Sequence, residues 1–371
     1  MDRVSDYAAR VVADPKAENA GNLHVLACKR HLKDLERQGT KEFPYIWDQK
    51  ASDRIIGYSE TLTVLEGAKP RPVHLLDCQA FDVGATFGWK KLDGNRRFRR
   101  RYKSVARQNG KTFENGIIGS YISNFSGYKY GKLFTVATKQ GQAKRAWDES
   151  AKFIRADKDL NELFRIQDYK LMITALQTWC TIEALSKERS LDDGFRSIFA
   201  SVDEIHQHPD NSIYKAIYNG QRSLAEALVS MITTRGKKLN SFCKEMDDYC
   251  ISILSGVATA EDFFIDIYCL DKHDDIWNPA NWIKANPSLC STEHGRETIA
   301  RDAQTAKDMG GADLRDFITK GLNMWVTSSD DAFVDAEKFA RCGSDRGLEH
   351  FRGRQCYVGL DLSSGGDLTT I

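Results

Sequence analysis

The sequence predicts an α/β fold, in which a parallel sheet is covered by helices on both faces. Three observations predict it. The chain has 371 residues, 41% of them hydrophobic and 10% aromatic, enough to bury a substantial core. From about residue 75, short apolar runs alternate with helical stretches, a pattern typical of parallel sheets. A predicted strand at 98–105 runs into Gly110-Lys111-Thr112 and then into a helix, which is the context of a phosphate-binding loop.

Composition excludes several classes of protein. The charged fraction is 28% and the net charge is +1, so wholesale disorder is excluded and any nucleic-acid contact must come from local patches. No apolar run approaches the roughly 18 residues of a membrane span. The nine cysteines form no C-x-x-C pair, which indicates a reduced interior and no zinc knuckle. We expect a soluble intracellular protein.

The first 74 residues predict a helical region. Apolar residues recur at helical spacing over 7–12, 23–35 and 52–66. The two prolines within 69–74 then break the helical pattern, so we place a boundary there.

The alternating region follows in order along the chain. We expect strands at 98–105, 132–137, 179–184, 197–202 and 228–232, and helices at 111–123, 139–155 and 210–225. Beyond residue 277, turns lead to helices around 293–309 and 312–325. The last stretch, residues 354–371, predicts a strand, a turn at Gly365-Gly366 and the start of a second strand.

The strongest chemical signal is the loop that ends in Gly110-Lys111-Thr112. Its backbone N–H groups and the following helix N-terminus can hold phosphate oxygens, while Lys111 reaches the β- and γ-phosphates and Thr112 offers a hydroxyl to Mg²⁺. The strict pattern has a glycine where this chain has Val105. The alternative is a chance triplet, which the strand–loop–helix context disfavours.

The second signal is Asp203-Glu204, at the carboxyl end of a predicted strand about 90 residues later. Ligands bind at that end of a parallel sheet. There an aspartate can hold Mg²⁺ and a glutamate can polarise the attacking water. An exposed acidic pair is the alternative, but after a phosphate loop the order favours ATP hydrolysis. The next strand ends in Thr233-Thr234, whose hydroxyls could contact the γ-phosphate and report hydrolysis.

Four further features have weaker interpretations. Gln79 could contact adenine through its amide. The basic run 90–103 either contacts DNA or forms a solvated or inter-subunit surface. We interpret His206 and His208 as polar loop residues. Asp361 lies in an apolar strand, where a carboxylate is costly unless it binds a cation, as in two-metal nucleases.

Taken in order, these motifs resemble the large terminase subunit of tailed double-stranded DNA phages and prophages. The resemblance covers essentially the whole chain. It rests on Gln79 and on "VARQNGKT", "TVATKQGQAK", "FASVDEIH", "MITTRG", "NPANWIKANPSL" and "GLDLSSGGDLT", and the opening "YAARVVAD" is similar to the family's helical start.

The resemblance implies a P-loop ATPase of the RecA/ASCE type joined to a ribonuclease H-like nuclease. The implied domains are an N-terminal helical region at 1–74, the ATPase at 75–276, a lid or linker at 277–344, and the first strands of the nuclease at 345–371. Such a motor uses ATP and Mg²⁺ to move double-stranded DNA into a prohead, and its nuclease uses Mg²⁺ or Mn²⁺ to cut concatemeric DNA. It implies partners (a portal protein, a terminase small subunit and a homo-oligomeric ring), no membrane, and the bacterial host cytoplasm.

The resemblance also implies roles for individual residues. Glu204 would be the catalytic glutamate, Arg107 would stabilise transition-state charge, and Thr233-Thr234 would couple hydrolysis to movement. The implied nucleotide-binding residues are Gln79, Arg107, Gln108, Asn109, Gly110, Lys111 and Thr112. The implied metal ligands are Thr112 and Asp203, with Asp361 in the nuclease.

The chain ends ten residues after Asp361, so we expect an incomplete nuclease and no metal-dependent DNA cleavage. One alternative function is a superfamily 2 helicase-like ATPase, but nothing after residue 277 predicts the second RecA-like domain that such helicases need. Another is a prophage remnant that only binds, against which intact Lys111, Thr112, Asp203 and Glu204 argue.

Overall fold

The computed structural model describes residues 2–67, 69–186, 196–326, 341–343 and 347–355. The chain divides into two units, Met1–Val326 and Thr327–Ile371. The second contains a short 3₁₀ helix, η6 (Leu348–Phe351). The strand–turn–strand expected near the end of the chain, with Asp361, lies outside the described residues.

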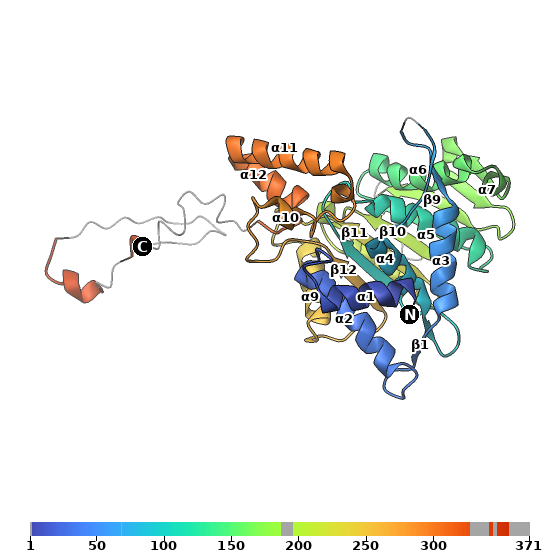
Figure 1. Ribbon diagram of the computed structural model, residues 1–371, viewed down its shortest axis with the longest axis horizontal. Coiled ribbons are helices and arrows are strands. Elements are labelled where there is room, and N and C mark those ends of the chain that lie inside the picture. Colours follow the sequence, from blue (N-terminus) through green and yellow to red (C-terminus); the bar gives the residue numbers. More distant parts are fainter. Residues whose placement is uncertain (1, 68, 187–195, 327–340, 344–346, 356–371) are drawn as a thin grey trace. The chain divides into compact units, whose positions relative to one another are not determined.

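An eight-stranded sheet forms the centre of the first unit (Figure 1). Its order is β12-β5-β11-β10-β6-β9-β8-β7; the first six strands run parallel to one another, and β8 runs antiparallel to both of its neighbours, β9 and β7. The bounds are β5 (Arg100–Ser104), β6 (Lys132–Ala137), β7 (Phe164–Gln167), β8 (Met172–Ala175), β9 (Thr181–Ser186), β10 (Phe199–Asp203), β11 (Leu228–Thr233) and β12 (Phe263–Ile267). All five predicted strands are confirmed within two residues, whereas β7, β8 and β12 were missed.

Two short antiparallel pairs lie outside the main sheet. They join β1 (Tyr45–Trp47) to β4 (Trp89–Lys91), and β2 (Thr63–Val64) to β3 (Arg71–Pro72). The second pair explains why the helix expected over 52–66 ends early at Thr61: the chain becomes extended so that Thr63 and Val64 can bond to the following strand.

The helices are α1 (Arg3–Ala13), α2 (Asn22–Arg37), α3 (Gln49–Thr61), α4 (Asp77–Gly88), α5 (Lys111–Phe125), α6 (Gln140–Ala156), α7 (Lys158–Glu162), α8 (Ser212–Gly220), α9 (Phe242–Leu254), α10 (Pro279–Trp282), α11 (Glu293–Met309) and α12 (Gly311–Asp316). Short 3₁₀ turns are η1 (Asp168–Lys170), η2 (Ile205–Gln207) and η3 (Leu289–Ser291), and a π-turn is η4 (Phe317–Gly321). Among the described residues, no helix combines the length and apolar character needed to cross a membrane.

Helices cover both faces of the sheet, as predicted. Successive residues of a strand face opposite sides of the sheet, so the contacts of two neighbouring residues of β5 show which helices cover each face. Arg101 contacts α4 and α5 through Asp82 and Glu114, while Tyr102 donates its hydroxyl to Asp247 of α9 at 2.9 Å. Helix α6 packs beside α5, and α2 packs against β12 and α9.

Four of the eight cations in the basic run 90–103 are buried (Arg96, Arg97, Arg101 and Lys103), so for these four the interpretation as a DNA-contacting or solvated surface is wrong. Arg97 pairs with Asp34 at 2.7 Å and with Glu261 at 2.5 Å, and Arg101 and Lys103 are equally buried. The physical reason is that β5 lies between β12 and β11, with helices on both faces. Its cations therefore need carboxylate partners, which come from elements distant in sequence.

A second, smaller core lies beyond β12. Trp282, Cys290, Ile299 and Phe317 pack together there, drawn from α10, η3, α11 and η4, and Ala106 joins them from the loop after β5. The predicted helix at 293–309 is confirmed. The one predicted at 312–325 is shorter, because helical geometry ends at Gly321 and Asn323 is left-handed at φ 52°.

Candidate nucleotide site

The loop between β5 and α5 has the shape of an anion cradle. Gln108 and Gly110 are left-handed, at φ 60° and 77°, so the chain curls before α5 begins at Lys111. Among the described residues, no hydrogen bond engages the backbone N–H groups of 108–112. Unpaired N–H groups at a helix N-terminus favour an anionic ligand. The loop therefore has the backbone geometry of an anion-binding site.

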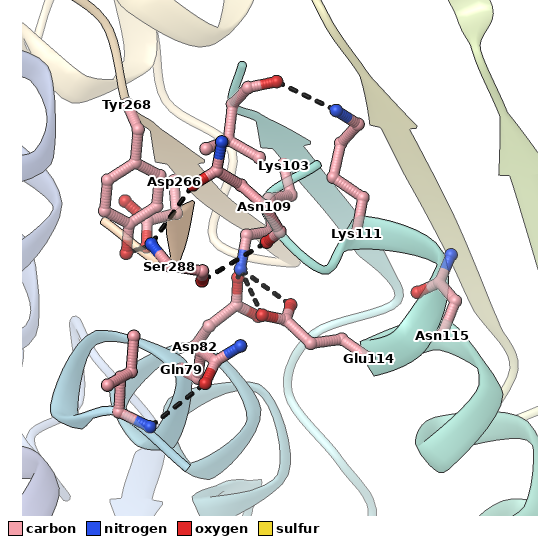
Figure 2. A network of polar contacts seen from close by, with 12 residues as sticks. Gln79, Asp82, Lys103, Asn109, Lys111, Glu114, Asn115, Asp266, Tyr268 and Ser288 are labelled. Carbon is pink, nitrogen blue, oxygen red and sulfur yellow. Dashed lines mark hydrogen bonds and ion pairs between the residues drawn. The ribbon is translucent and has the colours of Figure 1, made fainter. Parts of the chain in front are cut away.

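Lys111 lies buried at the base of this loop (Figure 2). Its Nζ donates to the carbonyl oxygens of Val105 and Ala106, at 2.9 and 3.0 Å, and to Oγ1 of Thr234 at 2.8 Å. Burial lowers the pKa of Lys111 to about 8, although the charges of Glu204 and Asp203 favour its charged form. The ammonium is thus held where it can exchange these oxygens for those of a phosphate.

Thr112 and Asp203, the two predicted metal ligands, meet beside the loop. Oγ1 of Thr112 donates to Oδ2 of Asp203 at 3.3 Å, while Oδ1 of Asp203 is buried and unpartnered among the described residues. Burial and the charge of Glu204 raise the pKa of Asp203 to about 6. An unpartnered carboxylate oxygen beside a hydroxyl fits a divalent cation. In the part of the chain described, no three His, Cys, Asp or Glu side chains cluster, so phosphate and water oxygens would complete the coordination.

Glu204 follows β10 in a left-handed conformation, at φ 50°, and contacts His206. Nδ1 of His206 lies 3.0 Å from Oε2 of Glu204 and 3.2 Å from Oγ1 of Thr233. Burial by itself would raise the pKa of Glu204, but His206 and Lys111 outweigh it and lower the pKa. Glu204 is therefore an ionised carboxylate at neutral pH.

We predicted from the sequence that His206 is only a polar loop residue. In the structure, its side chain contacts both Glu204 and Thr233. The one sequence signal was its position two residues after Glu204. His208 is buried, with Nε2 3.1 Å from the carbonyl oxygen of Asp203.

The predicted coupling residues do two different things. Oγ1 of Thr234 accepts from Lys111 and donates to the carbonyl oxygen of Val105 at 3.0 Å, so Thr234 supports the phosphate loop. Oγ1 of Thr233 instead accepts the backbone N–H of His206 at 3.3 Å. Because the two hydroxyls serve different neighbours, replacing both together would not separate coupling from nucleotide binding.

Gln79 and Arg107, the predicted adenine contact and transition-state cation, differ in exposure: Gln79 is buried and Arg107 is exposed. Gln79, on α4, is buried close to Gly110, and its Oε1 accepts the backbone N–H of Leu76 at 3.0 Å (Figure 2). Arg107 is exposed and, with His206 and Thr234, lines a cavity of about 230 Å³. Other side chains of this cavity are cationic: Arg235, Lys237, Lys238 and Lys320. The cavity therefore carries positive charge beside the predicted γ-phosphate position.

Under the loop lies a buried charge cluster that sequence reasoning missed (Figure 2). Lys103 donates to both oxygens of Glu114, at 2.5 and 2.6 Å, and lies 3.3 Å from Asp82. Arg101 pairs with the same two carboxylates at 2.5 and 2.7 Å. The cluster joins α4, β5 and the first turn of α5, so it fixes the helix whose N-terminus forms the cradle.

Comparison with known families decides which proteins this chain is related to. The sequence matches the family model described as terminase large subunit, ATPase domain, over residues 77–251, and that described as terminase large subunit, endonuclease domain, over 257–371. The chain belongs to the terminase large subunit family. The loop, Asp203 and Thr233 all lie within the ATPase match.

Two curated proteins show how far the similarity extends along the chain. The chain is 30% identical over 188 residues to Protein YmfN of Escherichia coli K12, covering 50% of this chain and 40% of that protein. It is 26% identical over 272 residues to the terminase large subunit of Enterobacteria phage HK97, covering 72% and 52%. It thus spans about half the length, or less, of these curated relatives.

A solved terminase structure confirms the predicted fold class. The crystal structure of the HK97 bacteriophage large terminase aligns with a TM-score of 0.64 at 22% identity, covering 74% of this chain and 55% of that one. The expectation that the nuclease is all but missing needs correction, however. The endonuclease match covers 257–371, so a region of the terminase nuclease family is present in this chain.

Proposed function

We propose that this terminase chain hydrolyses ATP at the loop around Lys111, as the motor that moves double-stranded DNA into a prohead. The observation that carries the proposal is the convergence of four groups at the carboxyl ends of β5, β10 and β11. Lys111, Thr112, Asp203 and Glu204 meet there below an open row of N–H groups. Family membership supports this function over the helicase-like alternative.

Each group has a defined task in hydrolysis. The free N–H groups of 108–112 and the ammonium of Lys111 bind the β- and γ-phosphates and stabilise the charge that develops on them. A Mg²⁺ ion held by Thr112 and Asp203 would neutralise phosphate charge. Glu204, ionised at neutral pH, orients the attacking water and accepts its proton. Arg107, exposed at the mouth of the cationic cavity, would stabilise the transition state, and Gln79 would contact adenine.

The remaining parts of the proposal concern the assembled motor. Its partners would be a portal protein, a terminase small subunit and further copies of this chain in a ring, in the host cytoplasm. The region 257–371 would act in cutting concatemeric DNA, with Mg²⁺ or Mn²⁺ and Asp361 as a ligand. The match to the endonuclease family supports this part.

Two substitutions test the ATPase. Glu204→Gln keeps the shape of the side chain but loses the base, so ATP should still bind while kcat falls by about 10² or more. Lys111→Ala should weaken both binding and turnover. Steady-state hydrolysis and titration with a fluorescent ATP analogue measure both.

Glu297→Gln and Lys129→Ala are matched controls at exposed positions. They should behave as the parent protein. Parent-like hydrolysis by Glu204→Gln would show that Glu204 is not the base, and an inactive parent protein would contradict the ATPase proposal as a whole.

A further inference from the structure

The side chain of Asn109 points away from the open N–H groups of the phosphate loop. It is only 2% exposed, and its Oδ1 accepts the backbone N–H groups of Ser288 and Leu289, both at 3.1 Å (Figure 2). Its Nδ2 donates to the carbonyl oxygen of Arg107 and to Oδ1 of Asn286, both at 2.9 Å. An amide has two donor hydrogens and two acceptor lone pairs. All four are engaged, so this side chain has no capacity left for a phosphate or a cation.

The side chain of Asn286 is also held by several hydrogen bonds, which join Asn109 to the smaller core. It is 1% exposed and donates to the carbonyl oxygens of Trp282, at 3.1 Å, and Gly321, at 2.6 Å. These carbonyls belong to the end of α10 and the end of η4. The two amides therefore connect the phosphate loop to both sides of the smaller core.

The backbone repeats this connection. The N–H of Ala106 donates to the carbonyl oxygen of Ala285 at 3.2 Å, and that of Arg107 donates to Lys320 at 3.0 Å. The loop is thus divided into two parts. Residues 106–107 are bonded to Ala285 and Lys320, whereas the N–H groups of 108–112 have no hydrogen-bond acceptor in the part of the chain that the structure describes.

We propose that Asn109 and Asn286 form a clasp that keeps the phosphate loop in its ATP-binding shape. Asn109 is then a positioning residue, not a side-chain ligand of the nucleotide. The free N–H groups converge only while Gln108 stays left-handed, a conformation that is unfavourable for a residue with a Cβ. The clasp holds the residues on either side of Gln108, so without it the loop relaxes and the N–H groups diverge.

The clasp also joins the two regions that the family models match. Asn109 lies in the ATPase match, whereas Asn286, Ser288 and Gly321 lie in the endonuclease match. The segment matched to the nuclease family therefore sets the affinity of the loop for ATP. This inference rests on the proposed ATPase function and assigns a task to the "NPANWIKANPSL" motif.

A double-mutant cycle tests the clasp in the full chain. Asn109→Ala and Asn286→Ala should each raise the KM for ATP about tenfold, the size expected for loss of one buried hydrogen-bond connection, with kcat nearly unchanged. The KM of the double variant should be no higher than that of the more affected single variant, because both substitutions break the same connection. Asn281→Ala is the control. Asn281 lies on α10 and donates to the backbone carbonyl oxygen of Asp275, so this substitution should leave KM unchanged.

The outcomes are distinct. If Asn109 instead ligated the nucleotide directly, the KM of Asn286→Ala would equal that of the Asn281→Ala control, and the effects of Asn109→Ala and Asn286→Ala on KM would add. Either result would overturn the clasp. If the alanine variants unfold, as judged by circular dichroism, Ser288→Pro removes one clasp N–H without emptying the core, and it should also raise KM. An unchanged KM there would likewise overturn the clasp. A parent protein without ATPase activity would refute the proposed function instead.

Discussion

Replacing Arg101 by methionine should destabilise the fold far more than removing an ion pair from the surface. Arg101 is 0% exposed, and so are both carboxylates that it contacts, Asp82 and Glu114. With Lys103 the cluster holds two positive and two negative groups. Burial raises the pKa of Glu114, whereas Arg101 and Lys103 overcome burial and lower that of Asp82. Removing Arg101 leaves two buried carboxylates facing one ammonium.

The expected cost follows from this imbalance. Breaking a buried pair by deleting one partner costs about 3–5 kcal/mol, because the remaining charge is desolvated without compensation. Arg155→Met is the matched control, since its ion pair with Asp168 at 2.6 Å is exposed on both sides and is worth about 1 kcal/mol or less. Asp82→Leu added to Arg101→Met restores charge balance and should recover a large part of the loss.

Urea unfolding followed by tryptophan fluorescence measures the three variants against the parent protein. The reasoning would be refuted if Arg101→Met lost no more stability than Arg155→Met. It would also be refuted if the double variant were less stable than Arg101→Met alone, because that would mean that Asp82 needs no countercharge.

Two further predictions concern buried or half-buried histidines. His206→Leu should lower kcat for ATP hydrolysis by up to about 10², with little change in KM, because Glu204 is misplaced. His206→Asn keeps a donor near the position of Nδ1 and should retain most turnover. Equal kinetics for the two variants would contradict a role for the contact between His206 and Glu204. Burial opposes charge on His24, but Asp266, 2.6 Å away, outweighs it and raises its pKa to about 10. The resulting stabilisation is complete below about pH 6.5 and is lost as pH rises towards 10. The unfolding free energy measured across this range should fall less steeply in His24→Gln, and parallel curves would speak against the pair.

Much of the fold was predictable because its signals are local. The strands β6, β10 and β11 are mostly apolar runs between helical stretches, a pattern typical of parallel strands with both faces buried, whereas β5 is largely cationic and was located by the loop that follows it. The loop at Lys111 and the acidic pair at Asp203 were likewise found from residue order. Strand β12, helix α9 and the antiparallel pair β7–β8 were not predicted. No motif flanks these segments to distinguish them from the loops around them.

Parts of the site could not be predicted from local order. The basic run containing Arg101 and Lys103 appeared to be a surface, since a sequence shows the cations but not the carboxylates that face them. The partners, Asp82 and Glu114, lie on helices before and after the strand. We interpreted His206 as a polar loop residue because it has no partner at helical i, i+4 spacing. Its contact with Glu204 depends instead on the left-handed conformation of Glu204, which nothing in the sequence marks.

The sequence by itself determined the order of the residues that we propose for ATP hydrolysis: the loop that ends in Lys111 and Thr112, and then Asp203 and Glu204 at the end of a later parallel strand. These properties are set by residue type and by distance along the chain. The tertiary structure decided which charges are buried, which threonine supports the loop, and that Asn109 faces Asn286. Those outcomes depend on which elements pack together, and partners such as Asn109 and Leu289, 180 positions apart, become neighbours only when the core closes around them.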